Sequence, residues 1–255
     1  MALRRELLIR EDGQGVSILD PLTDRTWVYS VEELASERVD PVLLEGPVSE
    51  VLRAQVWARN SRPSAPVFEV EDFDWGVVSE LPSEVSVRDP EVWRRLAEQR
   101  LAGDWILRVP GFTEWTPDQG DEERLDTELV HAWRVRAEAP LFSDPVVRQV
   151  CGAVLGIRLE GPVECNRWRM QAGDGILSHR VGRRYAATFT LGLNRGWTAA
   201  DGGAIAFGDP STGVVTDRWL PHAGDLCLFA GGEHSWHWVE APRRERHTLT
   251  GWWTY

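Results

Sequence analysis

The C-terminal half of the chain alternates apolar and small polar residues with a period of two. In YAATFTLGLN, residues 185–194, the residues on one face are Tyr, Ala, Phe, Leu and Leu, and those on the other are Ala, Thr, Thr, Gly and Asn. In RHTLTGWWT, residues 246–254, Arg246, Thr248 and Thr250 share one face. This period predicts β-strands with one apolar and one hydroxyl-bearing face. Such strands suit a barrel whose interior holds something polar.

Two segments carry the start and stop signals of α-helices. Asp89 and Pro90 open the sequence EVWRRLAEQRLAG, which ends at Gly103, so we expect a helix there. A second helix is expected after Asp144-Pro145, where valines recur at helical spacing. The intervening DWILRVPGF is typical of a strand, and the chain from residue 157 onward is predicted to consist mainly of strands joined by turns.

The N-terminal region has a different pattern. Residues 6–30 place turn clusters between apolar runs and predict two or three short strands, residues 47–59 are helix-like, and NSRPSAP is typical of a linker. We therefore predict an N-terminal α+β extension over residues 1–85, serving as a lid, a buttress or a recognition module, and a second domain over residues 86–255. The expected fold is mostly β with flanking helices.

Composition narrows the range of ligands. The 255 residues are 42% hydrophobic and 27% charged, which allows a core of normal size, and the net charge is −12. A nucleic acid is not expected as a partner, because binding phosphates needs clustered cations. All 28 basic residues are arginine, which excludes Schiff-base chemistry and the lysine-dependent phosphate loop.

The cysteines and the apolar runs bear on the compartment. Cys151, Cys165 and Cys227 lie far apart, and the N-terminal apolar run is too short for a signal peptide. No run approaches the length of a membrane span. We therefore expect a cytoplasmic protein with reduced, buried thiols and no membrane partner.

Two of the six histidines have settings that favour metal binding. His179 follows a Gly-Asp turn and precedes the strand over residues 185–194, and His237 lies nine residues before Arg246. His234 lies three residues before His237, and on one strand the two would face opposite ways, so both could bind one metal only across a turn.

The other histidines have ordinary settings. His131 is expected in an amphipathic helix and His222 in the turn LPHAGD. His179, His234 and His237 therefore remain as candidate metal ligands, and the family resemblance described next favours His237 over His234, which is then a residue near the site.

The order of these features resembles that of the Fe(II)- and 2-oxoglutarate-dependent oxygenases, specifically the prolyl-4-hydroxylase-like branch. Gly173-Asp174 precedes His179, and a strand ending in Leu-Asn is followed by DGG, by LPHAGDLCLF and by His237. Arg246 and Thr248 then lead into the closing strand, so the resemblance covers about residues 90–255.

The resemblance implies a double-stranded β-helix, or jelly-roll, that holds Fe(II) on His179 and His237. It also implies 2-oxoglutarate as co-substrate, with its far carboxylate paired with Arg246. A guanidinium is a fixed, bidentate carboxylate clamp, and Thr248 on the same strand face can add a hydroxyl. The implied activity is oxidation of an unactivated C–H bond in a small-molecule or peptide substrate.

One expected ligand is missing. The family pattern has Asp or Glu at position 181, and this chain has Val181, which cannot coordinate a cation. Halogenases of the superfamily carry Gly or Ala there and bind chloride instead, although the two methyl groups of a valine would crowd that ion.

Three accounts of the gap are open. Chloride or water fills it; another residue replaces the carboxylate; or the site is degenerate and the barrel is a binding protein that retains two histidines. The candidate replacement ligands are Asp174, Asp201, His222, Glu233 and His234. We expect an oxidoreductase, hydroxylating or halogenating, because a binding protein has less need of the paired histidines and the arginine.

The chain contains 14 tryptophans, and several, including Trp238, lie near the candidate ligands in sequence. Most are expected to pack the barrel. At least one is expected to exclude water from the site or to hold an apolar substrate.

Overall fold

The computed structural model describes the backbone of residues 8–12, 15–20 and 25–30, and then residues 73–117, 120–127, 129–182, 185–209, 214–231 and 235–254. Contacts divide the chain into two compact units, Met1–Ser61 and Arg62–Tyr255. Within the described residues, none of the helices has the length and apolar character needed to span a bilayer.

The N-terminal unit contains an antiparallel sheet of three strands in sequence order. These are β1 (Leu8–Asp12), β2 (Gly15–Asp20) and β3 (Arg25–Ser30). The predicted strands over residues 6–30 are confirmed. The helix-like stretch over residues 47–59 and the NSRPSAP linker lie outside the described residues.

Both predicted helices of the second unit are confirmed. Helix α3 (Pro90–Leu101) begins where the Asp89 side chain accepts a hydrogen bond from the Glu91 N–H at 3.0 Å. Helix α5 (Pro145–Leu155) begins at Asp144 in the same way and ends at Gly156, whose φ of +69° favours glycine. A 3₁₀ helix, η3 (Trp75–Glu80), and the short α4 (Pro140–Ser143) accompany them.

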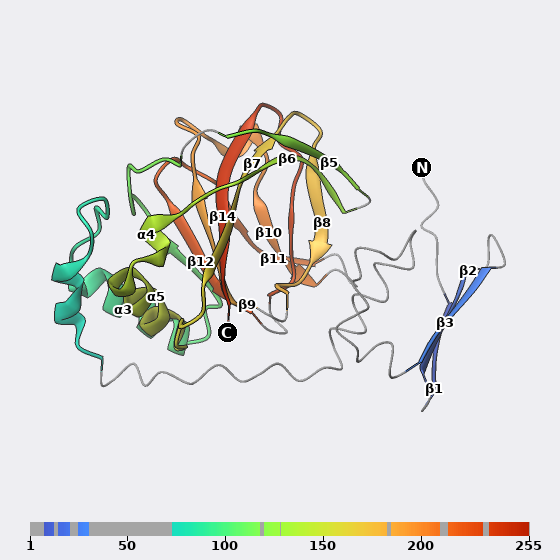
Figure 1. Cartoon of the computed structure of the whole chain (residues 1–255), viewed down its shortest axis with the longest axis horizontal. Coiled ribbons are helices and arrows are strands. Elements are labelled where there is room, and N and C mark those ends of the chain that lie inside the picture. The colour runs from blue at the N-terminus through green and yellow to red at the C-terminus, as the bar shows by residue number, and fades with distance from the viewer. Residues whose placement is uncertain are drawn as a thin grey trace. The chain divides into compact units, whose positions relative to one another are not determined.

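The rest of this unit is one curled antiparallel sheet, and Figure 1 shows it wrapping around an interior with the helices on one side. Its strands are β4 (Ile106–Val109), β5 (Glu123–Asp126), β6 (Val130–Arg136), β7 (Val163–Met170), β8 (Gly175–His179), β9 (Tyr185–Gly192), β10 (Ile205–Asp209), β11 (Val214–Trp219), β12 (Leu226–Ala230), β13 (His237–Val239) and β14 (Arg246–Thr254). Their order is β11-β10-β13-β8-β6-β7-β14-β9-β12-β4, with β5 beside β6. The predicted mostly β jelly-roll fold with flanking helices is confirmed.

The two edge strands of the sheet approach each other. Arg108 on β4 forms an ion pair with Asp217 on β11, so the sheet is nearly closed into a barrel. His131 lies on β6, where it pairs with Asp126 of β5, and the helix expected there is wrong. Pairing with strands on both sides determined the structure of this segment. Such pairing is not visible in the local periodicity of the sequence.

Two apolar clusters cover the two faces of the sheet. Between the sheet and the helices, Phe142 stacks on Phe189 with ring centroids 3.7 Å apart. Inside the barrel, Phe207 and Phe229 form a second cluster with Val181. The predicted domain boundary at residue 85 differs from the observed packing, because buried side chains over residues 73–85 belong to the first cluster.

Candidate active site

The two candidate ligand histidines lie opposite each other on adjacent strands. His179 ends β8, His237 begins β13, and the two are paired in register. Their ring centroids lie 4.2 Å apart. Since metal–imidazole bonds are about 2.1 Å long, both rings are within reach of one ion.

A β-bulge gives His179 this orientation. His237 pairs with His179 and Val239 with Ile176, so two steps along β13 correspond to three along β8. The extra residue re-aims the chain, and Ile176 and His179 both turn toward the interior although they are three residues apart.

Backbone carbonyls fix the tautomer of both rings. Nδ1 of His179 donates to the Leu177 carbonyl at 2.8 Å, and Nδ1 of His237 donates to the Ser235 carbonyl at 2.7 Å. A carbonyl only accepts, so in each neutral ring the hydrogen is on Nδ1 and Nε2 keeps its lone pair. This is the arrangement that metal-binding histidines use.

His237 is kept neutral by its surroundings. Its side chain is buried, with the rings of Phe207 and Phe229 at centroid distances of 5.9 and 5.0 Å. Burial, followed by the nearby His179, lowers the pKa of His237 well below 6.5, against the hydrogen bond to Ser235. At neutral pH the ring can therefore bind a cation without first losing a proton.

Arg246 lies in the interior, and one of its nitrogens has no partner among the described residues. Its Nε donates to the Gly203 carbonyl at 2.7 Å, and Nη1 donates to Thr248 Oγ1 at 3.0 Å. Nη2 is buried and has no hydrogen-bond partner in the described part of the chain. Burial lowers the pKa of Arg246 to about 9, so the guanidinium is charged at neutral pH. A buried cation with an open donor fits a carboxylate ligand.

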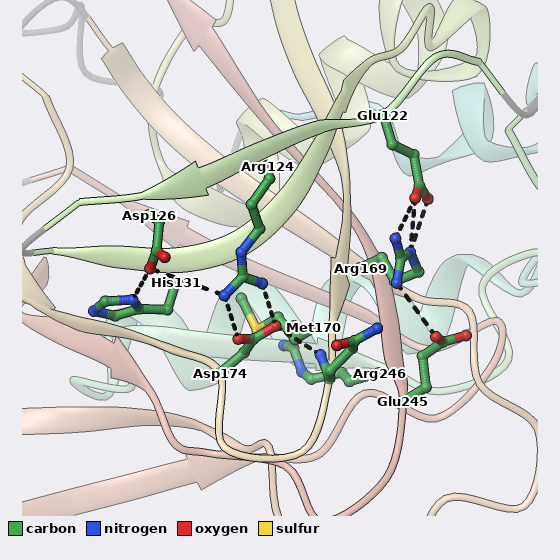
Figure 2. A network of polar contacts seen from close by, with 10 residues as sticks. Glu122, Arg124, Asp126, His131, Arg169, Met170, Asp174, Glu245 and Arg246 are labelled. Atoms are coloured by element: carbon green, nitrogen blue, oxygen red, sulfur yellow. Dashed lines mark hydrogen bonds and ion pairs between the residues drawn. The ribbon is translucent and has the colours of Figure 1, made fainter.

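The DGG motif makes room for this arginine. Gly203 has a φ of +65°, and a Cβ there would lie 2.9 Å from Cδ of Arg246. Met170 closes another side, with its sulfur 3.7 Å from Nη1, as Figure 2 shows beside the neighbouring ion pairs. Only glycine at position 203 permits this packing.

Residues 165–254 match the 2OG-Fe(II) oxygenase superfamily. The matched region contains both histidines, Val181, Arg246 and Thr248, and it supports an oxygenase that uses Fe(II) and 2-oxoglutarate. A search of curated proteins gives no match.

Solved structures share the fold of this oxygenase-like barrel. An oxidoreductase of the 2OG-Fe(II) oxygenase family from Burkholderia pseudomallei is 18% identical with a TM-score of 0.51, covering 64% of this chain and 90% of its own. A prolyl hydroxylase from Trichoplax adhaerens, solved with a hypoxia inducible factor peptide, is 16% identical with a TM-score of 0.50, covering 68% and 94%. A Pseudomonas putida prolyl-4-hydroxylase is 22% identical with a TM-score of 0.49, covering 64% and 98%.

Val181, the position at which the sequence resemblance predicts a missing carboxylate ligand, lies in the interior of the barrel. Its side chain is 2% exposed and packs in the interior cluster with Phe229. Its N–H donates to the Ser235 hydroxyl at 3.4 Å, and the Ser235 carbonyl is the partner of His237. Ser235 thus contacts the segments that carry both histidines. Nothing in the amino-acid sequence indicated this role.

The described residues offer no replacement for the missing carboxylate. Asp201 pairs with Arg244 at 2.8 Å, and His222 is exposed. No group of three His, Cys, Asp or Glu side chains that could hold a metal occurs among the residues with described positions. Glu233 and His234 lie outside those residues.

Asp174 has a structural contact instead. Its carboxylate accepts two hydrogen bonds from Arg124, at 2.8 and 2.9 Å, and one from the Gln171 N–H at 2.8 Å (Figure 2). Burial alone would raise the pKa of Asp174, but these hydrogen bonds outweigh it and the pKa lies below 3.8. The pair fixes the turn that enters β8.

Replacing Asp174 with asparagine is expected to lower the free energy of unfolding by about 1–3 kcal/mol, since it removes the charge from a buried hydrogen-bonded group. The pKa of Asp174 is lowered in the folded state, so its contribution is present above 3.8 and lost as the pH falls through the lowered value. Urea unfolding at neutral and acidic pH measures both effects. Asp126→Asn, at an exposed carboxylate, should change stability by less than about 0.5 kcal/mol, and an equal loss in both variants would contradict this role.

Trp238 does not join the histidine pair. It is paired with Ala206, and its neighbours in sequence, His237 and Val239, are buried on the opposite side of β13. Phe207 and Phe229 provide the aromatic wall instead, and neither was predicted from the sequence.

Proposed function

We propose that this protein is a non-haem Fe(II)- and 2-oxoglutarate-dependent oxidoreductase that hydroxylates an unactivated C–H bond. The observation that carries the proposal is the combination of two adjacent histidines, paired in register, with a buried arginine whose Nη2 has no partner among the described residues. When bound, the iron and 2-oxoglutarate supply oxidation by O2, in which the co-substrate loses CO2 and becomes succinate.

The protein's own residues have separate tasks in this proposal. His179 and His237 hold the metal through Nε2, and the carbonyls of Leu177 and Ser235 hold the two rings in place. Arg246, with Thr248 beside it, binds the far carboxylate of 2-oxoglutarate. The rings of Phe207 and Phe229 exclude water from the side of His237.

An assay of 2-oxoglutarate turnover tests the proposal. Purified protein with Fe(II) should show the weak visible charge-transfer band of the chelate under anaerobic conditions, and should form succinate once O2 is admitted. His237→Ala should abolish both signals. Absence of the band at about millimolar 2-oxoglutarate would favour the second candidate, a binding protein that retains two histidines.

Chloride is expected to have no effect on this site. Val181 is buried among apolar side chains, and in this proposal its two methyl groups would crowd a chloride ion beside the metal, which favours hydroxylation over halogenation. Titration of 2-oxoglutarate with and without chloride at constant ionic strength measures this. Binding that tightens several-fold with chloride but not with nitrate would contradict the hydroxylase and favour a halogenase.

A further inference from the structure

On the inner face of the sheet, paired residues of β14 and β7 form a row that runs from Arg246 to a cavity. On β14 and β7, Arg246 is paired with Met170, Thr248 with Trp168, Thr250 with Asn166 and Trp252 with Glu164. Directly paired residues point to the same side of an antiparallel sheet. The face that carries Arg246 therefore continues, through every second residue, to Trp252.

A cavity with a volume of about 780 Å³ lies at the Trp252 end. We call it the mouth cavity, and its lining residues used below are Arg134, Arg136, Glu138, Glu164, Trp168, Tyr185 and Trp252. Its volume lies within the range of roughly 300–1,000 Å³ that is typical of sites for small ligands.

The walls of the mouth cavity are aromatic. Trp252 stacks on Tyr185, with centroids 5.4 Å apart and an interplanar angle of 26°, and the Tyr185 hydroxyl donates to Glu164 at 2.8 Å. Trp168 forms a further wall. Flat, fixed aromatic surfaces favour a flat ring as ligand.

A buried hydroxyl lies in the strand row between Trp252, which lines this cavity, and Phe229, which contacts His237. Thr188 is paired with Trp252 on one side and with Phe229 on the other, and Phe229 contacts His237. Thr188 is 1% exposed, and its Oγ1 has no hydrogen-bond partner among the described residues. An unpaired buried hydroxyl is costly unless a ligand supplies the partner.

Thr190 provides the contrast. It lies two residues along the same face, is equally buried, and its hydroxyl is paired with that of Thr250 at 3.2 Å. The open hydroxyl is thus the one in the row that joins the mouth cavity to His237.

Charge around the cavity is balanced. Arg134 and Arg136 line it together with Glu138 and Glu164. A ligand with a single net charge gains nothing from such walls, whereas a neutral or zwitterionic one can be satisfied.

We propose that the mouth cavity binds the substrate, a small ring-bearing molecule without net charge, and that a polar group of this molecule hydrogen-bonds to Thr188. That the bound molecule is a substrate rests on the proposed function. The binding itself does not, and it is tested without metal or co-substrate.

Ligand-observed NMR titration of the metal-free protein tests the chemistry with three probes that share a phenyl ring. L-Phenylalanine is zwitterionic, phenylacetate anionic and phenethylamine cationic. The zwitterion should bind saturably and at least about threefold more tightly than either ion. No saturable binding by any probe, or tightest binding by one of the ions, would overturn the proposal.

Four variants locate the bound probe. Trp252→Leu and Thr188→Val should each weaken phenylalanine binding about two- to twelvefold, the equivalent of losing one aromatic contact or one hydrogen bond. Thr188→Ser should keep the affinity. Thr190→Val, which removes a hydroxyl that already has a partner, should leave it within about twofold.

A second cavity supplies the matched aromatic control. Trp236 lines a separate cavity with Phe207, and Trp236→Leu should not change the affinity for phenylalanine. Loss of binding in Trp236→Leu alone would overturn the assignment to the mouth cavity. If probe binding follows the expected pattern but no Fe(II)–2-oxoglutarate band forms, the proposed function fails and the ligand site stands. If the band forms but the probes do not bind as expected, only the ligand site is rejected.

Discussion

Replacing Arg246 with methionine is expected to weaken 2-oxoglutarate binding about a hundredfold or more. Loss of a buried cation from an ion pair costs roughly 3–5 kcal/mol, and a factor of ten corresponds to about 1.4 kcal/mol. The effect on protein stability is expected to be different when no co-substrate is bound. The variant then removes a buried guanidinium whose Nη2 has no partner among the described residues. We therefore expect the metal-free variant to be as stable as the wild type or more stable.

Anaerobic calorimetry with Fe(II) and 2-oxoglutarate, together with thermal melts of the metal-free protein, measures both effects. Arg244→Met is the matched control, since Arg244 lies two residues away, is partly exposed and pairs with Asp201. It should bind 2-oxoglutarate normally. Affinity within about threefold of the wild type in Arg246→Met would show that the co-substrate is held elsewhere.

Replacing Val181 with aspartate is expected to raise the affinity for Fe(II) about tenfold or more, because it adds an anionic ligand two residues after His179. In the metal-free protein the same change should lower stability by several kcal/mol, since Val181 is 2% exposed and the new carboxylate has no partner there. Fe(II) should therefore stabilise this variant far more than the wild type.

Val181→Asn is the control, since it matches aspartate in size and lacks the charge. It should share the loss of stability and show little of the gain in metal affinity. Melting temperatures with and without Fe(II), and a metal titration, measure the difference. Equal metal affinity in the aspartate and asparagine variants would mean that position 181 does not face the metal.

Much of this site could be predicted from strand periodicity. The period of two placed Arg246 and Thr248 on one face, and the structure joins them by a hydrogen bond of 3.0 Å. The choice of His179 and His237 needed the resemblance to a known family, because nothing local in the sequence brings together residues far apart in the chain. Their assignment as metal ligands stays a prediction.

The remaining features depend on pairing between distant segments. The bulge that re-aims His179 exists only in the register of β8 against β13. The open hydroxyl of Thr188 and the paired one of Thr190 look identical in sequence, and only the neighbouring strands distinguish them. The same reason explains why His131 was expected in a helix and lies in a strand.

The most direct test of the central claim is a crystal structure of the protein grown anaerobically with Fe(II) and 2-oxoglutarate. The account predicts one metal ion about 2.1 Å from Nε2 of both His179 and His237, with the far carboxylate of 2-oxoglutarate on Nη2 of Arg246. A metal ion bound away from these two rings, or a carboxylate that does not reach Arg246, would contradict it.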